Sequence, residues 1–166
     1  MQRIVVICLS LVSGISFSMA SDQVLPALNG VEIPKNYNNW RMIGVSHRLD
    51  KKSLRVILGN TTAVDFARSG KTGAWPDGSV LAKLVWKDRV HPDWDTAIVP
   101  GAMQHAEFMI KDAKKYRKTG GWGFARWLGT EQKPYATDGS ADQECFACHT
   151  KVKNSDYVFT QPATLP

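Results

Sequence analysis

Two cysteines and a histidine near the end of the chain have the types and the spacing for covalent cofactor chemistry. They lie in the pentad Cys145-Phe-Ala-Cys148-His149, and the C-x-x-C-H pattern is the attachment signature of c-type haem. Two thiols at this spacing can form thioethers to the two vinyl groups of one porphyrin, and the following imidazole can bind the iron. The sequence therefore predicts one covalent haem c, attached through Cys145 and Cys148, with His149 as the proximal ligand.

The pentad alone also admits a structural disulfide or half of a zinc site. A structural zinc site usually has four protein ligands, often with a second C-x-x-C pair. The other cysteine of the chain is Cys8, and it supplies no such pair. The spacing therefore favours haem over zinc.

The first part of the chain is typical of a secretory signal peptide. Arg3 precedes an apolar run, and small residues around Ala20 form a cleavage point. The run is too short to span a membrane, and Cys8 lies inside it, so we expect no membrane anchor. Residues 1–20 are predicted to be removed and 21–166 to form a single haem domain. Because haem c is attached outside the cytoplasm, we predict a periplasmic protein.

The charge pattern indicates no nucleic-acid partner. The formal net charge is +6, and the lysines are spread along the chain apart from a small cluster over residues 111–118. No aromatic interleaving or nucleic-acid motif accompanies them. Solvated lysines explain the charge, and a docking face for a soluble redox partner, such as another cytochrome, is compatible with it.

The position of the pentad separates classes of haem protein. Small electron-carrier cytochromes usually begin with this pattern and supply a distal methionine later, but no methionine follows His149. We therefore expect an open distal site, although Met42, Met103 and Met109 leave a six-coordinate centre open. The cytochromes c-prime place the pentad last, on a bundle of four long amphipathic helices, which this chain does not show.

The apolar residues instead alternate, as in half-buried strands. Alternating segments cover residues 54–59, 80–86, 106–110 and 122–128, and a short helix is expected over 61–69. Residues 140–143 have the pattern of a capping box, so the pentad is expected to open a helix. The predicted fold class is α+β: a mainly antiparallel β-sheet with a few short helices and a C-terminal haem-attachment helix.

Three motifs carry a resemblance to a known family. They are Trp75-Pro-Asp-Gly-Ser-Val-Leu-Ala-Lys83, Gly121-Trp-Gly-Phe-Ala-Arg-Trp127, and the pentad followed by Asp156-Tyr-Val-Phe159. In this order they resemble the cytochrome P-460 family, which includes the β-sheet cytochromes called c-prime-beta. The resemblance covers about residues 40–159. It implies a largely antiparallel β fold, in many members a homodimer, and a five-coordinate haem.

The resemblance implies one of two functions. Enzymes of the family oxidise hydroxylamine, and a lysine after the Asp-Gly turn is joined covalently to the porphyrin edge; Lys83 matches that lysine. The c-prime-beta branch binds nitric oxide without turnover. Lys83 favours an oxidase acting on hydroxylamine or a related small nitrogen compound. The alternatives are a nitric-oxide-binding protein and a mono-haem electron carrier.

The pattern around Lys83 gives some support of its own. Lys83 interrupts an apolar strand face between Leu81 and Val85. It could be a half-exposed lysine whose stem covers its apolar neighbours. A buried free ammonium would be costly, and a bond to the macrocycle would remove that cost.

Further polar residues are candidates for the distal side of the haem. Arg55 interrupts the apolar run of the preceding strand, and its guanidinium could hydrogen-bond a nitrogen oxide or be a solvated strand charge. His105 could relay a proton. Glu107 and Asp112 could act as general bases, and the pattern selects neither.

Overall fold

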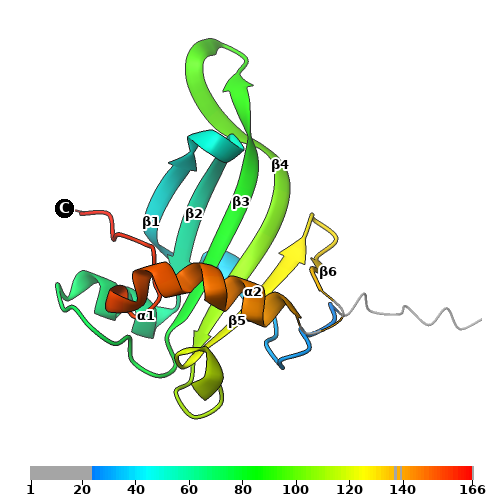
Figure 1. The fold of residues 1–166 in the computed structure, drawn as a ribbon. Helices are drawn as coiled ribbons and strands as arrows, with labels where there is room; N and C mark the ends of the chain where they lie inside the picture. The colour runs from blue at the N-terminus through cyan, green and yellow to red at the C-terminus, as the bar shows by residue number, and fades with distance from the viewer. Residues whose placement is uncertain (1–23, 137, 139, 166) are drawn as a thin grey trace, which may run out of the picture.

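A single six-stranded antiparallel sheet organises the chain (Figure 1). The computed structural model describes residues 24–136, 138 and 140–165, so the predicted signal peptide lies outside the described residues. Within them each strand pairs with the next, in the order β1 (Arg41–Arg48), β2 (Ser53–Gly59), β3 (Val80–His91), β4 (Trp94–Lys111), β5 (Trp122–Leu128) and β6 (Lys133–Pro134). The predicted α+β class with a mainly antiparallel sheet is confirmed.

Two α-helices and several 3-10 turns complete the described part of the chain. The elements are α1 (Thr61–Arg68), α2 (Ser140–His149), η1 (Tyr37–Asn39), η2 (Leu49–Lys51), η3 (Arg117–Thr119) and η4 (Thr150–Ser155). In the described ranges no helix is both long and apolar enough to cross a membrane. The helix predicted over 61–69 is confirmed, since Asn60 caps its start through the Ala63 N–H and Gly70 follows its end with a φ of 68°.

The turn before β3 forms as its sequence predicts. The N–H of Ser79 donates to the carbonyl of Pro76 at 3.0 Å, and Gly78 takes a φ of 84°, which glycine adopts at little cost. Because β3 begins directly after this turn at Val80, the turn sets which β3 side chains project from each face of the sheet.

The pentad lies at the C-terminal end of α2. The expectation that it begins a helix is wrong. Ser140 is already helical, and the Asp138 carboxylate accepts its backbone N–H at 3.0 Å and its hydroxyl at 2.6 Å, so the Ser140 side chain is bonded to a residue that precedes the helix. The carboxylate of Asp142 accepts the backbone N–H of Phe124 at 3.1 Å. This bond docks the first turn of α2 against β5, and the pentad falls in the last turns.

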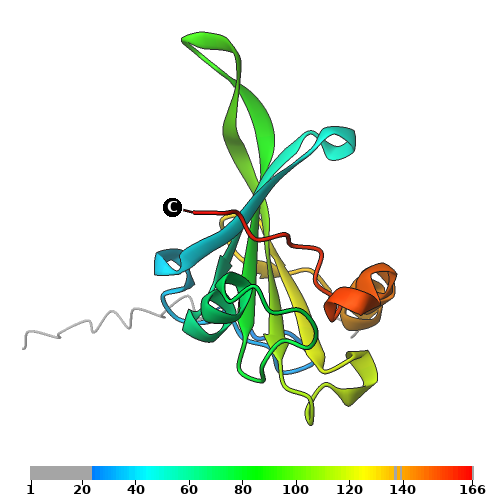
Figure 2. The same cartoon turned by 90° about the vertical axis from the view of Figure 1, so that its left-hand side faces the viewer.

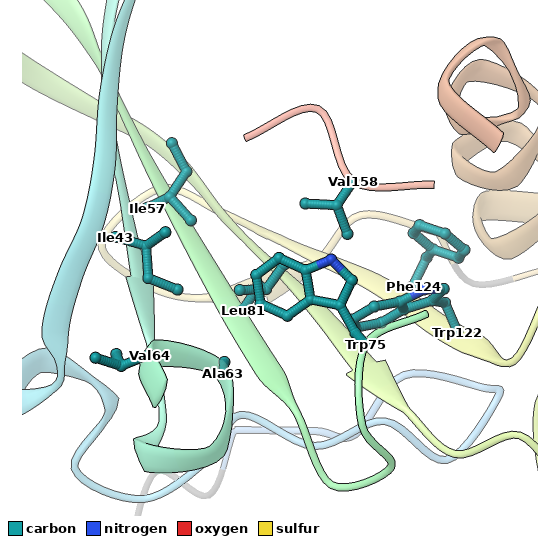
Figure 3. Packing of buried hydrophobic residues seen from close by; sticks show 9 residues of the cluster. All are labelled: Ile43, Ile57, Ala63, Val64, Trp75, Leu81, Trp122, Phe124 and Val158. Carbon is teal, nitrogen blue, oxygen red and sulfur yellow. The ribbon is translucent and has the colours of Figure 1, made fainter. Parts of the chain in front are cut away.

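The sheet has an apolar cluster on each face. One cluster packs α2 and the C-terminal segment against the sheet (Figure 3) and contains Ile43, Ile57, Ala63, Val64, Trp75, Leu81, Trp122, Phe124 and Val158. The other is covered by the N-terminal segment and contains Val31, Leu58, Ala82, Ala106, Phe108, Tyr116, Ala125 and Trp127. The predicted alternation in β3 is confirmed, because Leu81 and Ala82 belong to opposite faces.

Strands β3 and β4 continue past their neighbours as a projecting hairpin (Figures 1 and 2). Pairing extends to His91 opposite Trp94, with register shifts along the way. β4 is therefore much longer than the predicted segment 106–110. Figure 2 shows α2 and η4 standing to one side of the sheet, and this is the side on which the candidate site is built.

Candidate haem-binding site

A row of charged side chains crosses the face of the sheet that carries α2. Lys83 of β3 pairs with Glu107 of β4, and Glu107 pairs with Arg126 of β5. Directly opposite residues of antiparallel strands project from the same face. Two positions along β3 and β5 are Leu81 and Phe124, which belong to the cluster under α2. The charged row therefore projects to the side of the sheet on which α2 lies.

Glu107 is the centre of this charged cluster. Its carboxylate pairs with Lys83 Nζ, with Arg126 Nε at 2.8 Å and with His105 Nε2 at 3.2 Å. Its side chain is 15% exposed. Burial opposes ionisation, but the hydrogen bond from His105 and the charges of Lys83 and Arg126 hold the pKa of Glu107 well below its ordinary value. An ionised carboxylate is thus held in a mostly buried position.

Sequence reasoning missed the importance of two members of this cluster. Glu107 was one of two candidate bases, and Arg126 had no assigned role. Asp112, the other candidate, lies in a turn and accepts the N–H groups of Lys114 and Lys115. The available signal was that Arg126 interrupts the apolar face formed by Phe124 and Leu128, as Lys83 interrupts that of Leu81 and Val85.

The pentad lies close enough to the charged cluster for their charges to interact. Burial raises the pKa of the Cys145 thiol to about 11, while Arg126 lowers it and Glu107 raises it further. Cys145 is half-buried against the cluster under α2, whereas Cys148 is exposed, and both are free thiols. The two cysteines therefore do not form the disulfide that was considered as an alternative.

His149 is oriented as a metal ligand should be. Its Nδ1 lies 2.6 Å from the carbonyl oxygen of Tyr157, which can only accept, so Nδ1 carries the proton and Nε2 is left to bind a metal. The ring lies 5.0 Å from that of Phe124 and 5.1 Å from that of Phe159. Burial lowers the pKa of His149, although the Tyr157 bond opposes this, and metal ligation requires the neutral imidazole.

Arg55 lies on the same face, in the next row of the sheet. It pairs with Val85 of β3, and Val85 pairs with His105 of β4. Its Nε is buried and has no hydrogen-bond partner among the described residues, and burial lowers the pKa of its guanidinium. A buried cationic donor without an acceptor suits a polar or anionic group placed between the sheet and the pentad.

Of the three methionines considered as distal ligands, two lie on the wrong face. Met42 and Met103 pack against the cluster under the N-terminal segment. Met109 packs into the cluster beneath α2. A six-coordinate His/Met centre would therefore have to draw on Met109, which is already part of the core.

These features fit a haem attached between α2 and the sheet, and the comparison with known families agrees. The family model described as Cytochrome P460 matches residues 34–160. The chain belongs to the cytochrome P460 family. No curated protein matches the chain.

In this cytochrome P460 family member, haem binding follows from the family and is compatible with the residues present. In the described ranges no three His, Cys, Asp or Glu side chains come together to hold a metal ion. The residues predicted to hold it are Cys145 and Cys148 for the vinyl groups and His149 Nε2 for the iron. Their roles, and those of Lys83 and Arg55, stay predictions.

Proposed function

We propose that this cytochrome P460 protein is a periplasmic mono-haem oxidoreductase that oxidises hydroxylamine or a related small nitrogen compound. The observation that carries the proposal is the position of Lys83. It matches the linking lysine of the oxidase branch, and it projects toward the side of the sheet on which the pentad lies. A lysine on the other face could not serve this role.

When bound through the pentad, haem would supply redox-active iron for the oxidation of a small nitrogen compound. Oxidation of hydroxylamine also releases protons, so a base near the substrate is required. The ionised carboxylate of Glu107 can accept a proton there. The buried Nε of Arg55 can donate a hydrogen bond to an oxygen of the ligand. A soluble redox partner, such as another cytochrome, would accept the electrons.

The lysine link would change the charge balance of this cluster. A Lys83 nitrogen joined to the porphyrin edge no longer carries the ammonium charge that stabilises ionised Glu107. The pKa of Glu107 would therefore rise toward its ordinary value, because one of the cations that lower it is lost. Glu107 becomes a better proton acceptor in the linked protein.

One observation favours a second candidate, a nitric-oxide-binding protein without turnover. Lys83 Nζ is already paired with the Glu107 carboxylate. The carboxylate already neutralises the ammonium charge. Burial of that charge therefore does not favour a bond between Lys83 and a porphyrin. An unlinked Lys83 would leave an ordinary haem c with an open distal side.

We also propose export and self-association. Export rests on the predicted signal peptide over residues 1–20 and on the attachment chemistry of the pentad. A homodimer is supported by the β3–β4 hairpin, which presents exposed Val90, Trp94 and Ile98. A second copy could cover this apolar surface. Light scattering of wild type and Trp94→Ser tests the homodimer, and a monomeric wild type would contradict it.

The decisive experiment is the ferrous absorption spectrum of the exported holoprotein, followed by hydroxylamine turnover with an external electron acceptor. A shifted Soret band together with turnover supports the oxidase. An ordinary high-spin haem c spectrum with rapid nitric oxide uptake and no turnover assigns the second candidate. A low-spin six-coordinate spectrum in both oxidation states would instead indicate an electron carrier.

A further inference from the structure

The proximal histidine depends on a loop that is itself held by a buried ion pair. We propose that Lys111 and Asp156 are positioning residues for His149: they hold the Tyr157 carbonyl in place and so set the strength of the iron–histidine bond. The inference rests on the proposed binding of iron by His149. It assigns a role to an ion pair outside the charged cluster of Glu107.

The loop after η4 has an unusual backbone. Asp156 and Tyr157 adopt φ values of 49° and 64°, in the left-handed region that residues other than glycine seldom occupy. An aspartate tolerates this conformation better than a bulky aromatic residue does. Two such residues in succession persist only where their surroundings over-determine them. The conformation aims the Tyr157 carbonyl at His149 Nδ1, 2.6 Å away.

Asp156 is anchored by three separate parts of the chain. Lys111 Nζ, at the end of β4, donates to its two carboxylate oxygens at 2.7 and 2.9 Å. The N–H of Trp75 donates to the same carboxylate at 2.8 Å. Trp122 Nε1 donates to the Asp156 backbone carbonyl at 2.8 Å. The Lys111 and Asp156 side chains are only 7% and 10% exposed, so water competes weakly for this pair.

The Tyr157 ring also packs closely against the backbone of Gly120. Gly120 has a φ of 68°, and a Cβ at that position would collide with the Tyr157 ring. The same Lys111 Nζ that pairs with Asp156 lies 3.3 Å from the Gly120 carbonyl oxygen. Lys111 thus contacts both the segment that receives the Tyr157 ring and the residue that precedes Tyr157.

The carbonyl matters because it draws the Nδ1 proton away from the imidazole. This bond makes Nε2 a stronger donor to a metal and fixes the ring orientation. A stronger donor stabilises the oxidised iron, so it lowers the reduction potential. Loss of the anchor should therefore weaken the iron–histidine bond and raise the potential.

The test is Asp156→Asn in the exported holoprotein. Asparagine keeps the shape and tolerates the left-handed backbone, but it loses the charge that holds Lys111. The readouts are the iron–histidine stretching band of the ferrous protein by resonance Raman and the reduction potential. We expect the band to move to lower frequency and the potential to rise, with both thioethers retained. Lys111→Met, which keeps an apolar stem, should act in the same direction if Asp156→Asn fails to fold.

The matched control is Asp65→Asn, which removes an exposed ion pair with Arg41 and should change neither readout. If the Lys111 and Asp156 variants keep the wild-type band and potential, the positioning role is overturned while haem ligation stands. A five-coordinate high-spin ferrous wild-type protein without an iron–histidine band would overturn His149 as the ligand, and the positioning role with it.

Discussion

Lys83 of β3 and Glu107 of β4 stand opposite each other in the sheet, and their side chains form an ion pair on the face that carries α2. Lys83 is 29% exposed and neutralised, so the cost of a buried free ammonium, expected from the sequence, does not arise. Any bond to the porphyrin must therefore be driven by the position and reactivity of the lysine. Under the proposed function, whether Lys83 leaves this ion pair to bond the porphyrin distinguishes the oxidase from the nitric-oxide-binding protein.

Replacement of Lys83 separates the two functions. Lys83→Leu should keep both thioethers, return the ferrous Soret band to that of ordinary haem c and abolish hydroxylamine oxidation. Glu107 keeps Arg126 and His105, so the free energy of unfolding should fall by only about 1 kcal/mol. The measurements are absorption spectra, peptide mass and turnover. Lys87→Leu, an exposed lysine of the same strand, is the control, and identical spectra for wild type and Lys83→Leu would rule out the link.

Covalent attachment can be read from mass. The exported protein should gain one haem on a chain beginning near Ser21, and acid-acetone should not extract it. Cys145→Ser and Cys148→Ser should each retain haem through the remaining thioether, whereas the double variant should release it, because no thioether is left. Freely extracted haem in the wild type would contradict the attachment chemistry of the pentad.

The ionisation of Glu107 should make the free energy of unfolding depend on pH. Its folded pKa lies below the ordinary value of 4.5, so the unfolded state binds more protons as the pH falls below that value. The stabilisation is present above pH 4.5 and declines on acidification. Glu107→Gln should lose roughly 2–3 kcal/mol at neutral pH, because Lys83 and Arg126 are left facing each other.

Denaturant unfolding at several pH values measures this effect. The difference between wild type and Glu107→Gln should shrink between about pH 5 and pH 3. Glu32→Gln, at an exposed position, serves as the control and should leave the profile unchanged. A constant difference across this range would show that the carboxylate charge does not stabilise the fold.

Arg55 should act on the ligand more than on the fold. Its buried Nε has no acceptor among the described residues, so Arg55→Leu should not lower stability. Loss of a charged hydrogen bond to the ligand should reduce kcat/KM for hydroxylamine about 10–100-fold. Arg89→Leu on the projecting hairpin is the control. Equal turnover for Arg55→Leu and Arg89→Leu would show that Arg55 does not bind the ligand.

The two thiols should differ in reactivity before haem is attached. Burial holds the pKa of Cys145 at about 11, so little thiolate forms near pH 8, and alkylation requires the thiolate. In haem-free protein, iodoacetamide should modify exposed Cys148 at least about tenfold faster. Peptide mass spectrometry over time gives both rates. Equal rates would show that α2 does not bury Cys145 in the haem-free state.

Local features of the fold were predictable, but its boundaries were not. Period-two alternation correctly assigned Leu81 and Lys83 to one face of β3, because that property depends on a single strand. Strand β1 was missed since its exposed positions around His47 hide the alternation, and pairing with β2 stabilises it. The capping box failed because Ser140 is already helical and its hydroxyl donates to the Asp138 carboxylate.

The haem-attachment chemistry predicted for the pentad rests on the sequence by itself, because its cysteines and histidine lie within five consecutive positions and their spacing is local. The order of the motifs likewise identified the family. Only the tertiary structure decided that Glu107 lies between Lys83 and Arg126, since their contact requires the registers of three strands. It alone showed the Tyr157 carbonyl on His149. That bond depends on a left-handed backbone held by long-range contacts, for which the local sequence carries no signal.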